Sequence, residues 1–176
     1  SSRLAAAPIW IDDTPGVHVA DMRTRARQLK QRHGLGLVIV DYLQLGAAPE
    51  KGSSREQEVS RISRGLKAMA KELNVPVLAL SQLSRAAEAR GDHRPQLSDL
   101  RESGSIEQDA DVVIFLYRPD MYGNHDHPGA VELLVRKHRN GPTGDVRVLF
   151  DADTATFRDQ APGYRQAPQD QRWDQG

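Results

Sequence analysis

Short runs of apolar residues alternate along this chain with longer stretches in which apolar residues recur every three or four positions. A parallel sheet with crossover helices has this pattern, because its strands are covered on both faces and its helices on one. The pattern therefore predicts an α/β fold with a mostly parallel sheet flanked by helices. The predicted strands lie in the apolar runs at 8–11, 37–40, 75–80 and 112–117.

Helical periodicity is clearest between residues 59 and 73, and a second helix is predicted from about Val19 to the residue before Gly34. A short helix is expected to end near Ala110. Arginines and lysines occupy one face of the second helix, where they could contact phosphates or form a solvated surface. Each predicted helix buries one apolar stripe. The two longer stripes consist of Val59, Ile62, Leu66, Met69 and Leu73, and of Val19, Met22, Ala26 and Leu29.

From residue 130 the pattern changes to strict alternation, at 131–135 and again at 146–150, around a turn at 140–144. Alternation of this kind predicts an antiparallel hairpin at the end of the sheet. Beyond Arg158 the chain is rich in Gln, Pro and Asp and has little to bury. We therefore expect one domain over residues 1–158, followed by a polar, disordered C-terminal tail over 159–176.

Composition removes several classes of protein. The 176 residues include no cysteine, which excludes disulfides, thiol nucleophiles and thiolate metal sites. Twenty-four basic residues balance twenty-four acidic ones, so no net charge attracts the chain to nucleic acid or to an anionic membrane. Its apolar runs are far shorter than the roughly 20 residues that span a bilayer. We expect a soluble protein whose contacts with polyanions are local.

Polar residues follow three of the predicted strands. They are Asp41, the pair Ser81–Gln82 and the pair Tyr117–Arg118. In an open parallel sheet the carboxyl ends of the strands form the ligand-binding edge, so these side chains are expected along one rim. A carboxylate such as Asp41 could hold Mg²⁺ beside nucleotide phosphates, or it could cap a turn, and the local pattern does not separate the two.

Two further polar clusters suit anionic ligands. Residues 98–105 form a predicted glycine-containing loop that could hold a phosphodiester chain, or begin an ordinary capped helix. Lys137 and Arg139 share one strand face before the hairpin turn, and could meet phosphates or solvent. The segment 124–127 contains two histidines but no third ligand at a useful spacing, so we interpret it as a flexible loop.

The sequence lacks the phosphate-binding pattern G-x-x-x-x-G-K-[ST]. Residues 46–53 come nearest to it, but they place Lys51 before Gly52, and we interpret them as a surface loop.

Taken together, five segments in the same order resemble the DnaB family of bacterial replicative helicases. The resemblance covers the chain from about Pro8 to Phe157. The segments that carry it are Val38–Leu45, Ile62–Lys67 with Ala70–Leu73, Ala79–Arg85, Ser98–Asp111 and Lys137–Pro142.

The resemblance implies the C-terminal RecA-like ATPase domain of a helicase that works as a homo-hexameric ring and draws single-stranded DNA through its channel. It implies ATP and Mg²⁺ as cofactors, with primase and a helicase loader as partners, in the cytoplasm and without a membrane. Asp41 matches the aspartate that holds Mg²⁺, and Gln82 matches the residue that senses the γ-phosphate. Lys137 and Arg139 match cations that reach the ATP of the adjoining subunit. The residues that match the DNA-binding loop are Arg101, Glu102 and Gly104.

The chain departs from the family at one point. In the family the phosphate-binding loop, the catalytic glutamate and the primase-binding domain precede the segment that this chain matches. The resemblance therefore implies a C-terminal fragment or a truncated relative, inactive in ATP hydrolysis when alone. A non-catalytic DNA-binding or partner-docking module, and another RecA-type ATPase such as a recombinase, remain as alternatives.

Overall fold

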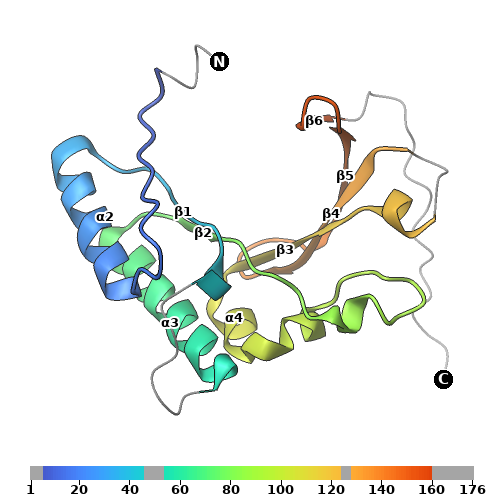
Figure 1. The fold of residues 1–176 in the computed structure, drawn as a ribbon, viewed down its shortest axis with the longest axis horizontal. Helices are drawn as coiled ribbons and strands as arrows, with labels where there is room; N and C mark the ends of the chain where they lie inside the picture. Colours follow the sequence, from blue (N-terminus) through green and yellow to red (C-terminus); the bar gives the residue numbers. More distant parts are fainter. Residues whose placement is uncertain (1–5, 46–53, 124–127, 160–176) are drawn as a thin grey trace. The chain divides into compact units, whose positions relative to one another are not determined.

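The computed structural model describes residues 6–45, 54–123 and 128–159, apart from the side chains of residue 45 and of residues 101–104. The chain divides into two compact units. The first comprises the chain up to Arg90 together with Gln96–Ala110, and the second comprises Gly91–Pro95 together with the chain from Asp111 onward. Figure 1 labels the helices and strands of both units.

The first unit combines a pair of parallel strands with helices. Strands β1 (Val38–Val40) and β2 (Val77–Ala79) pair in parallel, with Val40 opposite Ala79. This pairing and the helices confirm the predicted α/β class. The α-helices of this unit are α2 (Val19–His33), α3 (Arg55–Leu73) and α4 (Gly104–Asp109), and short 3-10 helices lie at Leu43–Leu45, Arg85–Ala87 and Leu97–Ser103.

Helix α3 is the centre of this unit and has the apolar stripe that the sequence predicts. It begins with a capping box, in which the Ser54 hydroxyl accepts the Gln57 N–H at 3.2 Å and the Gln57 side chain accepts the Ser54 N–H at 3.1 Å. It ends at Asn74, which adopts a left-handed conformation with φ of 46°. The buried apolar side chains of α3 are Val59, Leu66, Met69 and Leu73.

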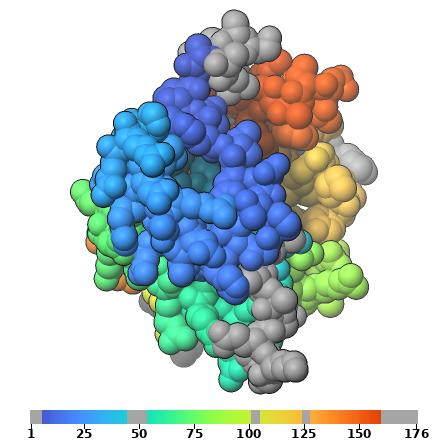
Figure 2. Space-filling model, turned by 60° about the vertical axis from the view of Figure 1, so that its left-hand side comes forward, coloured from blue at the N-terminus to red at the C-terminus, as the bar shows by residue number. Residues whose placement is uncertain are grey.

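Helix α2 packs its predicted stripe against α3. The stripe is half-buried, and a Cβ on Gly65 of α3 would lie 2.8 Å from Val19, so only glycine permits this approach. Arg23, Arg25, Arg27 and Lys30 of α2 bind carboxylates or a backbone carbonyl. Arg25 pairs with Asp12, and Arg27 pairs with Glu72. These pairs favour the solvated-surface interpretation of the basic face. Figure 2 shows the blue N-terminal part of the chain, which includes α2, at the surface of this view.

The second unit is built on an antiparallel four-stranded sheet in the order β3-β4-β5-β6. The predicted hairpin is confirmed as β4 and β5. The prediction that residues 112–117 join the parallel sheet is wrong for the described residues, because β3 pairs antiparallel with β4. The strands are β3 (Val112–Tyr117), β4 (Ala130–His138), β5 (Gly144–Asp151) and β6 (Thr156–Asp159).

Two other expectations differ from the structure. Residues 8–11 form no strand, and Ile11 is 87% exposed. The run at 37–40 is not covered on both faces by the described residues, because β1 and β2 pair only with each other and leave Ile39 and Leu78 more than half exposed. Apolar runs mark strands without identifying their neighbours.

Several predicted segments lie outside the described residues. They include the loops at 46–53 and 124–127 and the tail from residue 160. Asp159, the first residue of the predicted tail, is the last residue of β6. Because the residues from 160 onward are not described, the disorder of the tail stays a prediction.

Candidate functional site

Asp41 and Gln82 lie in the first unit, at the same end of its parallel strand pair. The Leu80 N–H donates to the Val40 carbonyl at 2.9 Å, and the Leu43 N–H donates to the Leu80 carbonyl at 2.9 Å. These bonds continue the pairing beyond the last residues of β1 and β2. Asp41 and Gln82 are both exposed at this edge. The structure therefore brings together the two residues that sequence reasoning assigned to the nucleotide.

Gln44, which lies in the 3-10 helix after Asp41, forms hydrogen bonds across this edge. Its side-chain nitrogen donates to the Ser81 hydroxyl at 3.1 Å and to the Gln82 carbonyl at 3.2 Å. Its side-chain oxygen accepts the Gln82 N–H at 3.3 Å. Sequence reasoning missed this role, although Gln44 lies in a segment that carries the family resemblance. The bridge fixes the backbone at Gln82 relative to the residues after β1.

The chemistry of this edge suits a hydrated cation and a phosphate. The described residues contain no group of three or more His, Asp or Glu side chains arranged to hold a metal. A single exposed carboxylate nevertheless fits Mg²⁺, which keeps several waters and takes the rest of its ligands from phosphates. Asp41 could provide that carboxylate, and the Gln82 amide could donate to a phosphate oxygen.

The segment predicted as a DNA-holding loop is helical instead. Leu97–Ser103 forms a 3-10 helix and runs directly into α4, so the alternative of an ordinary helix start describes its backbone better than an open loop. Arg101, Glu102 and Gly104 lie in this segment, and the side chains of Arg101 and Glu102 are outside the described part of the chain.

Polar contacts hold both ends of this helical segment on the first unit. Asp99, 2% exposed, accepts two hydrogen bonds from Arg90, at 2.7 and 2.5 Å, and its carbonyl accepts the Ser84 N–H at 3.1 Å. At the other end, α4 is joined to α3 by hydrogen bonds between Ser105 and Ser60 and between Asp109 and Ser63. The segment is thus anchored two residues before Arg101 and again directly after Gly104.

Lys137 and Arg139 lie in the second unit, where β4 ends. The Arg139 N–H donates to the Asp111 carbonyl at 2.8 Å, and its guanidinium lies 3.2 Å from the Asp111 carboxylate, with both side chains about half exposed. The turn after Arg139 is tight. A Cβ on Gly141 would clash with the His138 ring, which donates to the Pro142 carbonyl at 3.2 Å. This turn therefore has one favoured shape beside Arg139.

Tyr117 and Arg118 do not belong to the parallel strand pair, as β3 lies in the antiparallel sheet. Arg118 pairs with Asp120 at 2.9 Å and holds the pKa of that carboxyl below its usual value. Tyr117 is buried, which raises the pKa of its hydroxyl, and this hydroxyl donates to the Asp92 carbonyl at 3.0 Å. The prediction that these two residues extend the rim of the parallel sheet is not supported.

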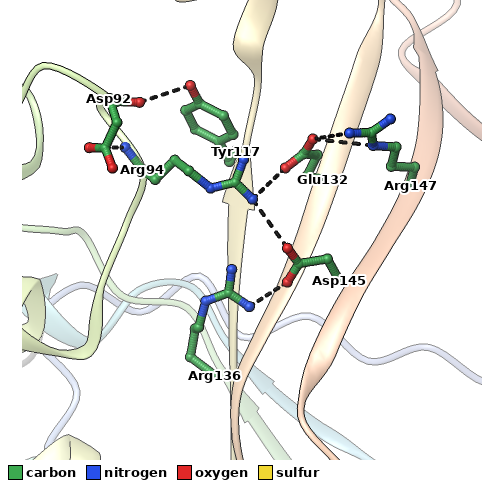
Figure 3. A network of polar contacts seen from close by, with 7 residues as sticks. All are labelled: Asp92, Arg94, Tyr117, Glu132, Arg136, Asp145 and Arg147. Carbon is green, nitrogen blue, oxygen red and sulfur yellow. Dashed lines mark hydrogen bonds and ion pairs between the residues drawn. The ribbon is translucent and has the colours of Figure 1, made fainter. Parts of the chain in front are cut away.

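A network of arginines and acids covers one face of the antiparallel sheet (Figure 3). Glu132 is only 5% exposed and receives Arg94 at 2.7 Å and Arg147 at 3.1 Å. Asp145 receives Arg94 at 3.2 Å and also pairs with Arg136, whose hydrogen bond lowers the pKa of Asp145. Sequence alternation suggested no role for these residues, because it does not reveal which charged side chains meet.

The family model of the DnaB-like helicase C-terminal domain matches residues 1–159. The chain belongs to this family. Among relatives, the replicative DNA helicase DnaB of Leifsonia xyli subsp. xyli is 54% identical over 162 residues, which are 91% of this chain and 35% of that protein. DnaB of Geobacillus stearothermophilus is 55% identical over 150 residues, or 84% of this chain and 33% of that protein. The chain thus spans about a third of the length of these relatives.

Solved structures share this fold. One, described as an ATPase domain, aligns with a TM-score of 0.86 at 44% identity and covers 91% of this chain and 57% of that one. A DnaB-like replicative helicase, described together with its interactions with primase, aligns with a TM-score of 0.87 at 44% identity and covers 91% of this chain and 40% of that one. These alignments confirm the predicted RecA-like fold class. No helix in the described part of this chain is long and apolar enough to cross a membrane.

Proposed function

We propose that this chain is the C-terminal part of a replicative helicase motor, which couples ATP hydrolysis to movement on single-stranded DNA in a ring of six subunits. One observation carries the proposal: in a member of the DnaB-like family, Asp41 and Gln82 lie at one strand edge, where Gln44 bridges to Gln82. Membership of this family also supports primase and a loader as partners, and a cytoplasmic location.

Each predicted site residue has a role in this proposal. Asp41 would hold Mg²⁺ through its waters, and Gln82 would donate to the γ-phosphate. Lys137 and Arg139 would neutralise charge on the phosphoryl group in the neighbouring subunit's site. Mg²⁺-bound ATP supplies the phosphoryl group that is transferred to water. Arg101, Glu102 and Gly104 would contact the sugar-phosphate backbone, so binding would not depend on base sequence.

The test uses a hybrid helicase, in which residues 1–159 replace the aligned segment of the Geobacillus stearothermophilus relative. We expect this hybrid to show DNA-stimulated ATPase activity. Arg139→Gln should lower its turnover by about 10³-fold, because an arginine supplied in trans stabilises the transition state, and should leave nucleotide binding unchanged. Arg158→Gln, which changes an exposed arginine of β6, is the matched control.

Two results would contradict the proposed function. An inert hybrid with Arg139 intact would show that this segment does not complete a helicase motor. Loss of ATP binding in Arg139→Gln would place this arginine in its own subunit's site and not in the neighbour's.

A further inference from the structure

Strand β4 contains one residue more than β3 near the end of their pairing. Val113 pairs with Lys137, whereas the next residue of β3, Ile114, pairs with Val135. Arg136 is therefore an extra residue on β4, which is the definition of a β-bulge. Bulges of this kind redirect the side chains that follow them.

The bulge decides which face of the sheet carries Lys137. Paired residues of an antiparallel sheet share a face, and Leu134 pairs with Phe115 as Lys137 pairs with Val113. Because Val113 and Phe115 are two residues apart on β3, Lys137 lies on the face of Leu134. Strict alternation would place Lys137, three residues after Leu134, on the opposite face. Arg139 continues the same ladder through its hydrogen bond to Asp111.

The bulged residue is held by the charged network of the second unit. Arg136 donates to Asp145, which lies opposite Leu134 on β5 and therefore on the same face. Asp145 also receives Arg94, and Arg94 in turn binds the buried Glu132 (Figure 3). Both Arg136 and Asp145 are largely buried, at 30% and 25% side-chain exposure. The network thus holds the bulge at one place in the strand.

We propose that Arg136 is a positioning residue, which fixes the bulge through Asp145 and thereby aims Lys137 and Arg139 at the nucleotide of the adjoining subunit. This inference rests on the proposed function, because it requires those two cations to act in trans. It gives Arg136, Asp145 and Arg94 a role that requires no contact between them and the nucleotide. Release of Arg136 would allow the strand end to shift, and a misplacement of about 1 Å costs catalysis up to about a hundredfold.

The test is complementation between subunits of the hybrid helicase. Arg136→Gln should lower turnover about tenfold to a hundredfold with little change in the KM for ATP, and Arg136→Lys should restore most of it by keeping the ion pair. Mixed rings of Arg136→Gln and Asp41→Asn subunits should turn over several-fold faster than either homogeneous ring. In such rings the Asp41→Asn subunit supplies correctly aimed cations to the intact Asp41 of its neighbour. Asp145→Asn should behave as Arg136→Gln does.

The outcomes separate this inference from the proposed function. Mixed rings of Arg139→Gln and Asp41→Asn report on the cations alone, and failure of that pair to complement would overturn the trans role itself. If that pair complements but the variants at Arg136 and Asp145 do not, their role is structural and the positioning inference is wrong. Full turnover in Arg136→Gln would also overturn it. Arg158→Gln should match the unsubstituted hybrid throughout.

Discussion

At the scale of single residues, Asp99 is a buried carboxylate of the first unit that accepts several hydrogen bonds. Its side chain is 1% exposed and receives two hydrogen bonds from Arg90 and one from the Gln96 N–H at 2.7 Å. A buried charge is tolerated only when it is paired and hydrogen-bonded. Removal of this carboxylate would take two hydrogen bonds from the partly buried Arg90 guanidinium.

We therefore expect Asp99→Ala to lower the free energy of unfolding by about 3–5 kcal/mol. Urea denaturation followed by circular dichroism would measure the change. Arg158→Ala is the control, because this arginine is 65% exposed and loses a surface pair with Asp151, and loss of such a pair costs at most about 1 kcal/mol. Equal losses in the two variants would show that the Arg90–Asp99 pair has no special role in stability.

Arg101 carries the clearest prediction about DNA. Arg101→Ala should weaken binding to single-stranded DNA and reduce the slope of log affinity against log salt by about one, as expected for one lost phosphate contact. Fluorescence anisotropy at several salt concentrations would test this. An unchanged slope would assign the segment 98–105 to another role.

The sequence correctly predicted the shared location of Asp41 and Gln82, whereas their roles stay predictions. Asp41 and the pair Ser81–Gln82 directly follow apolar runs, and parallel pairing places Asp41 and Gln82 at one edge. Gln44, Asp99 and Glu132 were missed, because their importance comes from partners distant along the chain. Arg94, for example, binds Glu132 from a different segment of the sequence. A single sequence does not show which distant residues contact one another.

At the scale of elements, α3 depends on its capping box for a defined start. Ser54→Ala should cost about 1 kcal/mol of stability, because the Gln57 N–H loses its acceptor. Thermal denaturation would measure the loss. Thr24→Ala within α2 is the control and should cost nothing, since alanine has the higher helix propensity. A harmless Ser54→Ala would mean that α3 is held by packing alone.

The antiparallel sheet should lose stability in acid through Asp145. Arg136 lowers the pKa of this carboxyl in the folded state below the ordinary 3.8. Its contribution is therefore complete above the unfolded pKa and disappears as the pH falls through the folded one. The stability difference between the original chain and Asp145→Asn should shrink below about pH 4. Urea denaturation across pH would test this, and a constant difference would exclude the ion pair as its source.

Element boundaries were easier to predict than element partners. The run at 112–117 coincides with β3, and the hairpin at 130–150 is β4 and β5. The neighbour of β3 was predicted wrongly, because a continuous apolar run does not show which strand it pairs with, and in the structure only alternate residues of β3 are buried. The bulge at Arg136 was also invisible in the sequence, since it depends on register with β3.

At the scale of the whole molecule, the family resemblance predicted contacts with DNA, which the composition did not predict. Zero net charge argues against a general affinity for DNA, whereas the proposed function requires a local phosphate-binding surface. The chain spans about a third of the length of the relatives named above. The helicase proposal is therefore tested in a hybrid of full length and not in this segment alone.

Gly91–Pro95 belongs to the second unit, although the residues on either side of it belong to the first. The chain passes from one unit to the other after Arg90, after Pro95 and after Ala110. One protease cut within residues 91–95 would therefore leave the units joined at the third passage. The two fragments would also remain associated through the Arg90–Asp99 pair and the bonds between α3 and α4. Such a nicked chain should give two bands in denaturing electrophoresis but one species in native size-exclusion chromatography.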